Sequence, residues 1–171
     1  MELWDLYDEN RNPAGREHIR GNDIPDGYYH IVVHVWIRNS KGQYLISQRS
    51  ANRPNLPLMW ETVGGSVLKG ETSLQGAVRE VKEEVGIDVN GTENNLVFSQ
   101  VRKVINGKKF NDILDVWLFE YNGEVQLDNA TTDEVEQTKW LNVAEIKELY
   151  ESKQLVSTLG YFFDKIGGQD E

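Results

Sequence analysis

The chain contains no cysteine and only 4 prolines among its 171 residues. Disulfide bonds, thiolate metal ligands and cysteine nucleophiles are therefore excluded. No apolar run is long enough to span a membrane, and the first residues, MELWDLYDENR, lack the basic and then apolar segments of a secretion signal. These absences favour a cytoplasmic protein with no membrane partner, in which any catalysis depends on oxygen and nitrogen groups or on a metal ion.

Positive charge is also scarce. The chain has 18 Lys and Arg against 28 Asp and Glu, a formal net charge of -10. This balance argues against a nucleic acid polymer as partner, because such binding depends on clustered Lys and Arg. A small anionic substrate remains compatible with the charge if a divalent cation bridges it to an acidic site.

Length and composition predict one globular domain over residues 1–171, with 39% hydrophobic and 27% charged residues. Residues 1–25 are expected to form an N-terminal hairpin around an Asn-Pro-Ala-Gly turn. The next segment, YYHIVVHVWIRNSKGQYLISQRS, predicts two strands, of which the first is nearly continuous in apolar residues, as in a central strand. Residues 51–62 are expected to form a loop.

The second half predicts one long helix and further strands. TSLQGAVREVKEEVG has Thr72 or Ser73 as N-cap and Gly86 as a stop. Asn106 and Gly107 predict a hairpin turn. A strand around TKWLNV precedes two helices, near residues 143–152 and 154–166, and residues 167–171 form a polar tail. The expected class is α/β or α+β with a mixed sheet.

The charged run REVKEEVG within the long helix raises the question of function. On an α-helix Glu80, Glu83 and Glu84 share one face, and the apolar residues on the other side hold that face in one orientation. Three neighbouring carboxylates repel one another unless a cation lies among them. The alternative is an ordinary solvated face in which Arg79 pairs with Glu83.

Residues at fixed distances from this run decide between the two interpretations. Gly65 and Glu71 precede Arg79-Glu80-Val81, and Glu83-Glu84 and Gly86-Ile87 follow. So many specified positions coincide by chance in on the order of one chain per million or fewer. Residues 65–87 resemble the Nudix box of the Nudix hydrolases. The resemblance implies an α/β/α sandwich around a mixed sheet. It also implies hydrolysis of nucleoside di- or triphosphates, or of nucleoside diphosphates linked to another group, with Mg²⁺ or Mn²⁺.

The same resemblance assigns roles within the box. It implies that Glu83 and Glu84 are metal ligands, that Glu80 is a ligand or the base, and that Gly65 offers its backbone carbonyl to the metal. Arg79 would orient the glutamates, and the role of Glu71 is left open. This donor set agrees with the preference of Mg²⁺ for carboxylates together with substrate phosphates.

Further candidates lie outside the box. Glu134 matches a loop carboxylate that reaches the metals in the family, although it is equally typical of a solvated loop acid. Arg49 and Arg53 are candidate contacts for the diphosphate. Trp60, with Tyr28 or Tyr29 as alternatives, is a candidate for stacking on a planar group, although such aromatics more often belong to a core. The apolar N-terminal strands are compatible with a homodimer.

The N-terminal half resembles one branch of the family, that of isopentenyl-diphosphate isomerase, in LWDLYDENRNPAGREH, YYHIVVHVWIRNSKGQYLISQRS and LPLMWET. Isomerisation of isopentenyl diphosphate is therefore an alternative function. That enzyme needs a cysteine where this chain has Gly64, and a histidine where it has Ser66. His30 matches an isomerase metal ligand and His18 lies near another, but both are also typical of scaffold positions; no role is predicted for His34. A third alternative is a non-catalytic nucleotide-binding module, although no box carboxylate is missing.

Overall fold

The structure, a computed structural model, describes residues 1–168. Its strands and helices follow one another along the chain as β1 (Leu3–Tyr7), β2 (Pro13–Ile19), β3 (His30–Arg38), β4 (Tyr44–Arg49), β5 (Trp60–Glu61), β6 (Val63–Ser66), α1 (Ser73–Val85), β7 (Leu96–Ile105), β8 (Lys108–Glu120), β9 (Val135–Leu141), α2 (Val143–Glu151) and α3 (Phe162–Lys165). Three short 3₁₀ turns, η1 (Glu93–Asn95), η2 (Leu127–Asn129) and η3 (Ser157–Leu159), complete the order.

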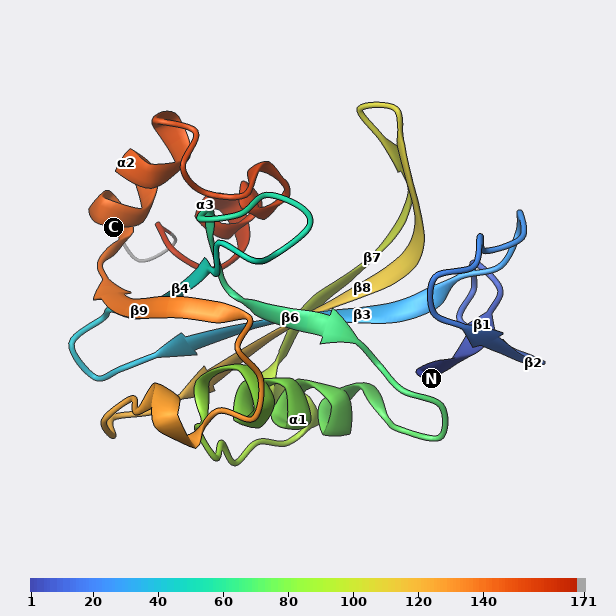
Figure 1. Cartoon of the computed structure of the whole chain (residues 1–171), viewed down its shortest axis with the longest axis horizontal. Helices are drawn as coiled ribbons and strands as arrows, with labels where there is room; N and C mark the ends of the chain where they lie inside the picture. Colours follow the sequence, from blue (N-terminus) through green and yellow to red (C-terminus); the bar gives the residue numbers. More distant parts are fainter. Residues whose placement is uncertain (169–171) are drawn as a thin grey trace.

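The large sheet is mixed, as the sequence predicts. Its main path runs β5-β4-β3-β8-β7, and β6 pairs with β3 while β9 pairs with β4. Strands β3 and β8 are parallel, whereas the pairs β3–β6, β4–β9 and β7–β8 are antiparallel. Strands β1 and β2 form a separate antiparallel pair, which lies at one end of the sheet in Figure 1.

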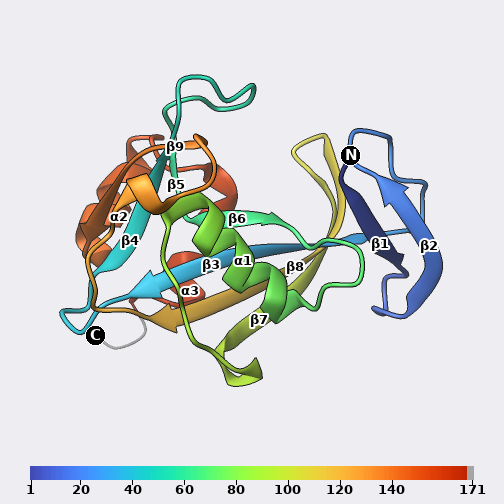
Figure 2. The ribbon, with the colours of Figure 1, turned by 60° about the horizontal axis from the view of Figure 1, so that its bottom comes forward.

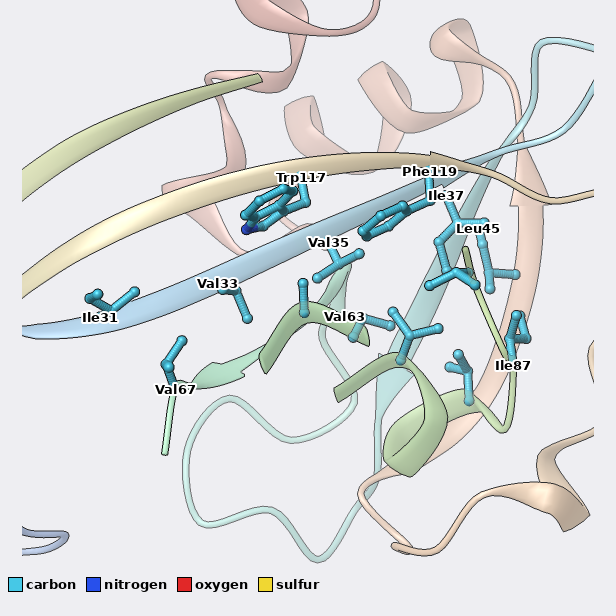
Figure 3. Packing of buried hydrophobic residues seen from close by; sticks show 14 of the residues in the cluster. Ile31, Val33, Val35, Ile37, Leu45, Val63, Val67, Ile87, Trp117 and Phe119 are labelled. Carbon is cyan, nitrogen blue, oxygen red and sulfur yellow. The ribbon is translucent and has the colours of Figure 1, made fainter. Parts of the chain in front are cut away.

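Helices cover both faces of the sheet, which gives the expected α/β/α sandwich. Helix α1 lies on one face, and α2 and α3 lie on the other (Figure 2). Strand β3 supplies side chains to both layers. Val33 and Val35 pack into the cluster that contains Val81 and Val85 of α1, whereas Trp36 packs into the cluster with Ile146 of α2 and Phe162 of α3. Figure 3 shows part of the first cluster, with Trp117 and Phe119 of β8 beside the strand. This confirms β3 as a central strand buried on both faces.

Two predicted boundaries are wrong. The turn of the N-terminal hairpin lies over Asp8–Asn12, because the Asp8 carboxylate accepts backbone hydrogen bonds from Asn10 and Asn12, and Pro13–Gly15 already belong to β2. The helix expected over 154–166 is reduced to α3 and the turn η3. Its first residues are extended instead, since Trp60 bonds to Gln154 O and Val156 N through its backbone.

The loop expected over 51–62 also ends early, since Trp60–Glu61 form strand β5. The remaining predicted elements agree with the structure. The turn between β7 and β8 has positive φ at both Asn106 (50°) and Gly107 (80°), the geometry of the predicted hairpin. Of the predicted polar tail over 167–171, residues 169–171 lie outside the described residues. Within residues 1–168, no helix is long and apolar enough to cross a membrane.

Tyr161 ties the C-terminal segment to the central strand. Its hydroxyl accepts a hydrogen bond from Trp36 Nε1 at 2.9 Å and lies 2.8 Å from His34 Nδ1. The hydroxyl keeps its own proton when it accepts from Trp36, so it can donate that proton to His34 Nδ1; this pairing places the proton of the neutral imidazole on Nε2.

We expect Tyr161→Phe to lower the free energy of unfolding by about 1–3 kcal/mol, because it leaves the buried Trp36 N–H and His34 Nδ1 without partners. Urea unfolding monitored by tryptophan fluorescence measures the change. Tyr150→Phe is the matched control, since it removes the same hydroxyl from a side chain that is 39% exposed. Equal losses in the two variants would contradict the role of this hydrogen-bond chain.

Acidification is expected to destabilise the fold through two buried histidines. Burial lowers the pKa of His34 to about 3, and burial together with the charges of His18 and Arg102 lowers the pKa of His30 to about 4. Both groups titrate near pH 6.5 in an unfolded chain, so below that pH the unfolded state binds more protons than the native state. Each of these two histidines therefore lowers the stability as the pH falls, with a slope of about 0.7 kcal/mol per pH unit at pH 6.5 that approaches about 1.4 kcal/mol per pH unit near pH 5.

Urea unfolding at pH 7.5, 6.5, 5.8 and 5.0 measures this slope. The control is His30→Phe, which preserves a ring that stacks on Trp4 but removes one titrating group. We expect this variant to lose about 2 kcal/mol less stability than the wild type between pH 7.5 and 5.0, because one titrating group is removed. An unchanged slope would contradict the assignment of His30 as a buried neutral group.

Candidate functional site

Helix α1 is fixed at both ends and along one side. Thr72 is the N-cap, and a reciprocal capping box with Gln75 satisfies the first turn. Gly86 ends the helix in the left-handed conformation, with φ 73°, and its N–H donates to Lys82 O. Ala77, Val81 and Val85 are buried in the core. The orientation of the acidic face therefore follows from the packing of the opposite side.

The acidic face is unusually poor in solvent. Glu84 is only 2% exposed, and its carboxylate accepts a hydrogen bond from Gly64 N at 3.3 Å. Burial and the negative charges of Glu80, Glu61 and Glu134 raise the pKa of Glu84 well above its usual value. Burial also raises the pKa of Glu80, although Glu84 and Arg79 partly offset it through hydrogen bonds and charge.

Arg79 is the main cation within this group. Its Nε and Nη2 donate to the two carboxylate oxygens of Glu71 at 2.8 and 3.0 Å. Its Nη1 lies 3.0 Å from both Glu80 and Glu83, and Nη2 also donates to Ser66 O. Burial alone lowers the pKa of Arg79, but the bonds and charges of Glu71 and Glu80 outweigh it and raise the pKa. Glu71 therefore lies in this network through its paired contact with Arg79.

A cavity of about 750 Å³ opens beside the acidic face. Four parts of the chain line it: the N-terminal hairpin, the loop after β4, the segment from β6 to α1, and the loop before β9. The lining residues that carry charge are Glu2, Arg20, Arg53, Lys69, Arg79, Glu80, Glu83 and Glu134. Glu84 lies beneath this surface rather than in it, since it is buried and absent from the lining.

The site residues predicted from the sequence fall into two groups, those that line this cavity and those that lie elsewhere. Gly65, Arg79, Glu80 and Glu83 line the cavity, and so do Glu134 and Arg53, which form an ion pair at 3.1 Å. Arg49 instead pairs with Glu61, with both contacts within 3.1 Å. Trp60 is buried and lines a different hollow, beside Lys139.

The tyrosines and histidines also lie elsewhere. Tyr29 is buried in the core, and Tyr28 stacks under Arg16. His18 and His30 both stack on Trp4, at ring-centre distances of 5.9 and 4.1 Å, and His34 bonds to Tyr161.

Sequence reasoning missed two contributors. Glu61 is partly buried and its charge acts on Glu84, and burial raises the pKa of Glu61 against the opposing charge of Arg49. In the short strand β5, the apolar Trp60 faces the core and the acidic Glu61 faces the other way. This alternation is the sequence signal that could have identified Glu61. The second contributor is the hairpin wall, with Glu2 and Arg20, for which the sequence holds no signal because the contact joins segments distant along the chain.

The donor set suits a hard divalent cation. Glu61, Glu80, Glu84 and Glu134 interact electrostatically, and their mutual repulsion raises the pKa of the buried Glu84. Carboxylate oxygens are the ligands that Mg²⁺ and Mn²⁺ prefer. Within residues 1–168, no three His, Asp or Glu side chains already stand in the arrangement of a metal site.

Comparison with known proteins gives matches over most of the chain. The model of the NUDIX domain family matches residues 28–162. An uncharacterized Nudix hydrolase of Listeria monocytogenes is 38% identical, over 95% of this chain and 91% of that protein. The isopentenyl-diphosphate Delta-isomerase of Klebsiella pneumoniae is 28% identical, over 81% of this chain and 75% of the enzyme. The crystal structure of a MutT protein from Methanosarcina mazei is similar, with a TM-score of 0.63, 27% identity, and coverage of 80% and 91% of the two chains.

The adjacent glycines of β6 should respond differently to substitution. A Cβ at position 64 would lie 2.9 Å from the backbone oxygen of Val33, whereas a Cβ at position 65 would overlap only the movable carboxylate of Glu80. We therefore expect Gly64→Ala to lower the free energy of unfolding by about 1–3 kcal/mol, and Gly65→Ala to change it by less than about 1 kcal/mol. Denaturant unfolding of both variants measures this. A loss in Gly65→Ala as large as in Gly64→Ala would show that Glu80 cannot move.

Proposed function

Because this chain belongs to the Nudix hydrolase family and is a pyrophosphohydrolase, we propose that it hydrolyses a nucleoside di- or triphosphate, or a nucleoside diphosphate linked to another group, using Mg²⁺ or Mn²⁺. The family as a whole hydrolyses compounds that contain a linked nucleoside diphosphate. The proposal adds to this the metal dependence, attack of water at phosphorus, and action on a small molecule in the cytoplasm.

The position of Glu84 is the observation that carries this proposal. It is a buried carboxylate that receives a hydrogen bond from Gly64 and lies among three other acidic groups. Leaving a charge of this kind buried without a cation is costly. Glu80 and Glu83 lie above it at the cavity surface. A divalent ion held by Glu80, Glu83, Glu84 and the carbonyl of Gly65 would compensate the charge at the point where a diphosphate can reach it.

The side chains of the protein then have distinct tasks. When bound, the divalent ion would neutralise diphosphate oxygens and orient water. Arg79 holds Glu80 and Glu83 through its Nη1, and Arg53, which also lines the cavity, would present its guanidinium to the substrate phosphates. Glu80 and Glu134 both face the cavity, and either carboxylate can accept the proton of the attacking water.

The geometry at Gly64 disfavours the isomerase alternative. That reaction needs a cysteine at this position, and the backbone here leaves no room for a Cβ, because the Val33 oxygen lies 2.9 Å away and His34 Cδ2 3.3 Å away. The chain also contains no cysteine elsewhere. Incubation with isopentenyl diphosphate tests the alternative directly, and formation of the dimethylallyl isomer would support it against hydrolysis.

We expect Glu83→Gln and Glu84→Gln each to lower metal-dependent turnover by about 100-fold, because each removes one charged oxygen donor from the site. The measurement is release of phosphate or nucleoside monophosphate from a panel of nucleotides and nucleotide sugars with Mg²⁺ or Mn²⁺. Glu84→Gln should also be at least as stable as the wild type, since it removes a buried charge.

Glu148→Gln is the matched control, because it makes the same change on an exposed position of α2. It should retain wild-type turnover. The proposal is wrong if the wild type hydrolyses no diphosphate on the panel with either ion, or if Glu83→Gln and Glu84→Gln remain as active as the control.

A further inference from the structure

The cavity is larger than a diphosphate requires, and its second wall comes from the N-terminal hairpin. Its volume of about 750 Å³ lies within the range of sites that enclose a whole small-molecule ligand. Met1, Glu2, Leu3 and Arg20 line it together with Arg79, Glu80 and Glu83 of α1. Figure 2 shows β1 and β2 beyond the end of β6 that leads into α1. The cavity that holds the acidic face therefore extends to the hairpin, where a group attached to a diphosphate can lie.

Arg20 is held in place on this wall by a chain of contacts. Its Nη1 donates to Glu2 Oε2 at 3.0 Å, and its backbone N–H donates to Glu2 O at 3.0 Å. The other carboxylate oxygen of Glu2 accepts from Trp4 Nε1 at 2.8 Å. Trp4 is buried and stacks on His30 with an angle of 9° between the rings. The guanidinium is thus oriented by a buried aromatic pair, although its own side chain remains 60% exposed.

Lys69 is a second cation in the lining of this cavity. Its backbone N–H donates to Leu3 O at 2.9 Å, which fixes the loop against β1. Its ammonium group pairs with Glu17 of β2, and about half of the side chain is exposed. Within residues 1–168, Arg20 and Lys69 form their ion pairs with Glu2 and Glu17 rather than with the glutamates of α1. Their positive charges are therefore separate from the acidic face.

The hairpin also lies outside the part of the chain that matches the family model, which begins at residue 28. The shared domain supplies the acidic face, and residues 1–20 supply the opposite wall. A wall that is not part of the shared domain is suited to select among substrates that have the same scissile linkage.

We propose that Arg20, assisted by Lys69, binds an anionic group on the part of the substrate beyond the scissile diphosphate, and so makes the hairpin the specificity wall of the site. This inference rests on the proposed function. A phosphate or carboxylate would accept hydrogen bonds from the guanidinium donors that Glu2 leaves unused. The substrate class is then a nucleoside diphosphate joined to an anionic group rather than to a neutral sugar.

The test compares two substrates with the same nucleoside diphosphate, ATP and ADP-ribose, which carry a phosphate and a neutral ribose beyond it. In Arg20→Gln we expect the ratio of kcat/KM for ATP to that for ADP-ribose to fall about tenfold, mainly through KM, as one charge-assisted hydrogen bond is lost. Arg20→Lys retains the charge and should recover part of the ratio.

Arg16→Gln is the matched control. It removes the same charge from strand β2, but Arg16 stacks on Tyr28 and lines a different hollow. It should leave the substrate ratio at the wild-type value. A ratio in Arg20→Gln within twofold of the control would overturn the inference and leave the proposed hydrolase function intact.

A binding measurement that needs no turnover separates the proposed anion site at Arg20 from the proposed hydrolase function. Calorimetric titration of ATP in EDTA measures affinity when no divalent ion is present. Arg20→Gln should bind ATP about tenfold more weakly than wild type and Arg16→Gln. Equal affinities of Arg20→Gln and wild type would overturn the role of Arg20, whatever the turnover assays show. Absence of turnover together with weakened binding would instead reject the hydrolase function and retain the anion site.

Discussion

The guanidinium of Arg79 is the group on which the arrangement of the acidic residues depends. It contacts three carboxylates and the carbonyl of Ser66 from one position on α1. Without it, Glu71, Glu80 and Glu83 would repel one another across a short stretch of helix. The planar fork of arginine suits this task better than lysine, because it offers five donors in fixed directions. The contact with Glu71 uses Nε and Nη2 of the guanidinium and leaves Nη1 for Glu80 and Glu83.

Glu84 differs from the three carboxylates that Arg79 contacts. It lies one turn beyond Glu80, beneath the cavity surface, and one of its oxygens accepts a hydrogen bond from the N–H of Gly64. Two glycines make this approach feasible, since a side chain at position 64 or 65 would meet Val33 O or Glu80. The uncompensated charge is therefore a consequence of how closely β6 approaches α1. The buried carboxylate of Glu84, rather than the number of glutamates alone, distinguishes this acidic face from a solvated helix surface.

Much of the fold and the box could be predicted because the signals are local. The caps of α1, its apolar stripe and the Asn106-Gly107 turn all depend on residues within a few positions of one another. The helix expected over 154–166 failed because Gln154 and Val156 bond to Trp60, a partner far away in sequence. The hairpin wall and Glu61 were missed for the same reason. Trp60 was a candidate for stacking on the substrate, with a place in a core as the alternative, and its burial arises from packing that composition does not reveal.

The two walls of the cavity are linked through one buried carboxylate. Asp115 of β8 is fully buried and receives both Nη atoms of Arg11, from the hairpin turn, at 2.8 and 2.6 Å. Burial tends to raise the pKa of Asp115, but hydrogen bonds from Arg11, Ser73 and Ser99 outweigh it and lower the pKa. Ser73 is the first residue of α1. The hairpin and the acidic helix are thus anchored on the same side chain, which holds the distance between the specificity wall and the acidic face constant.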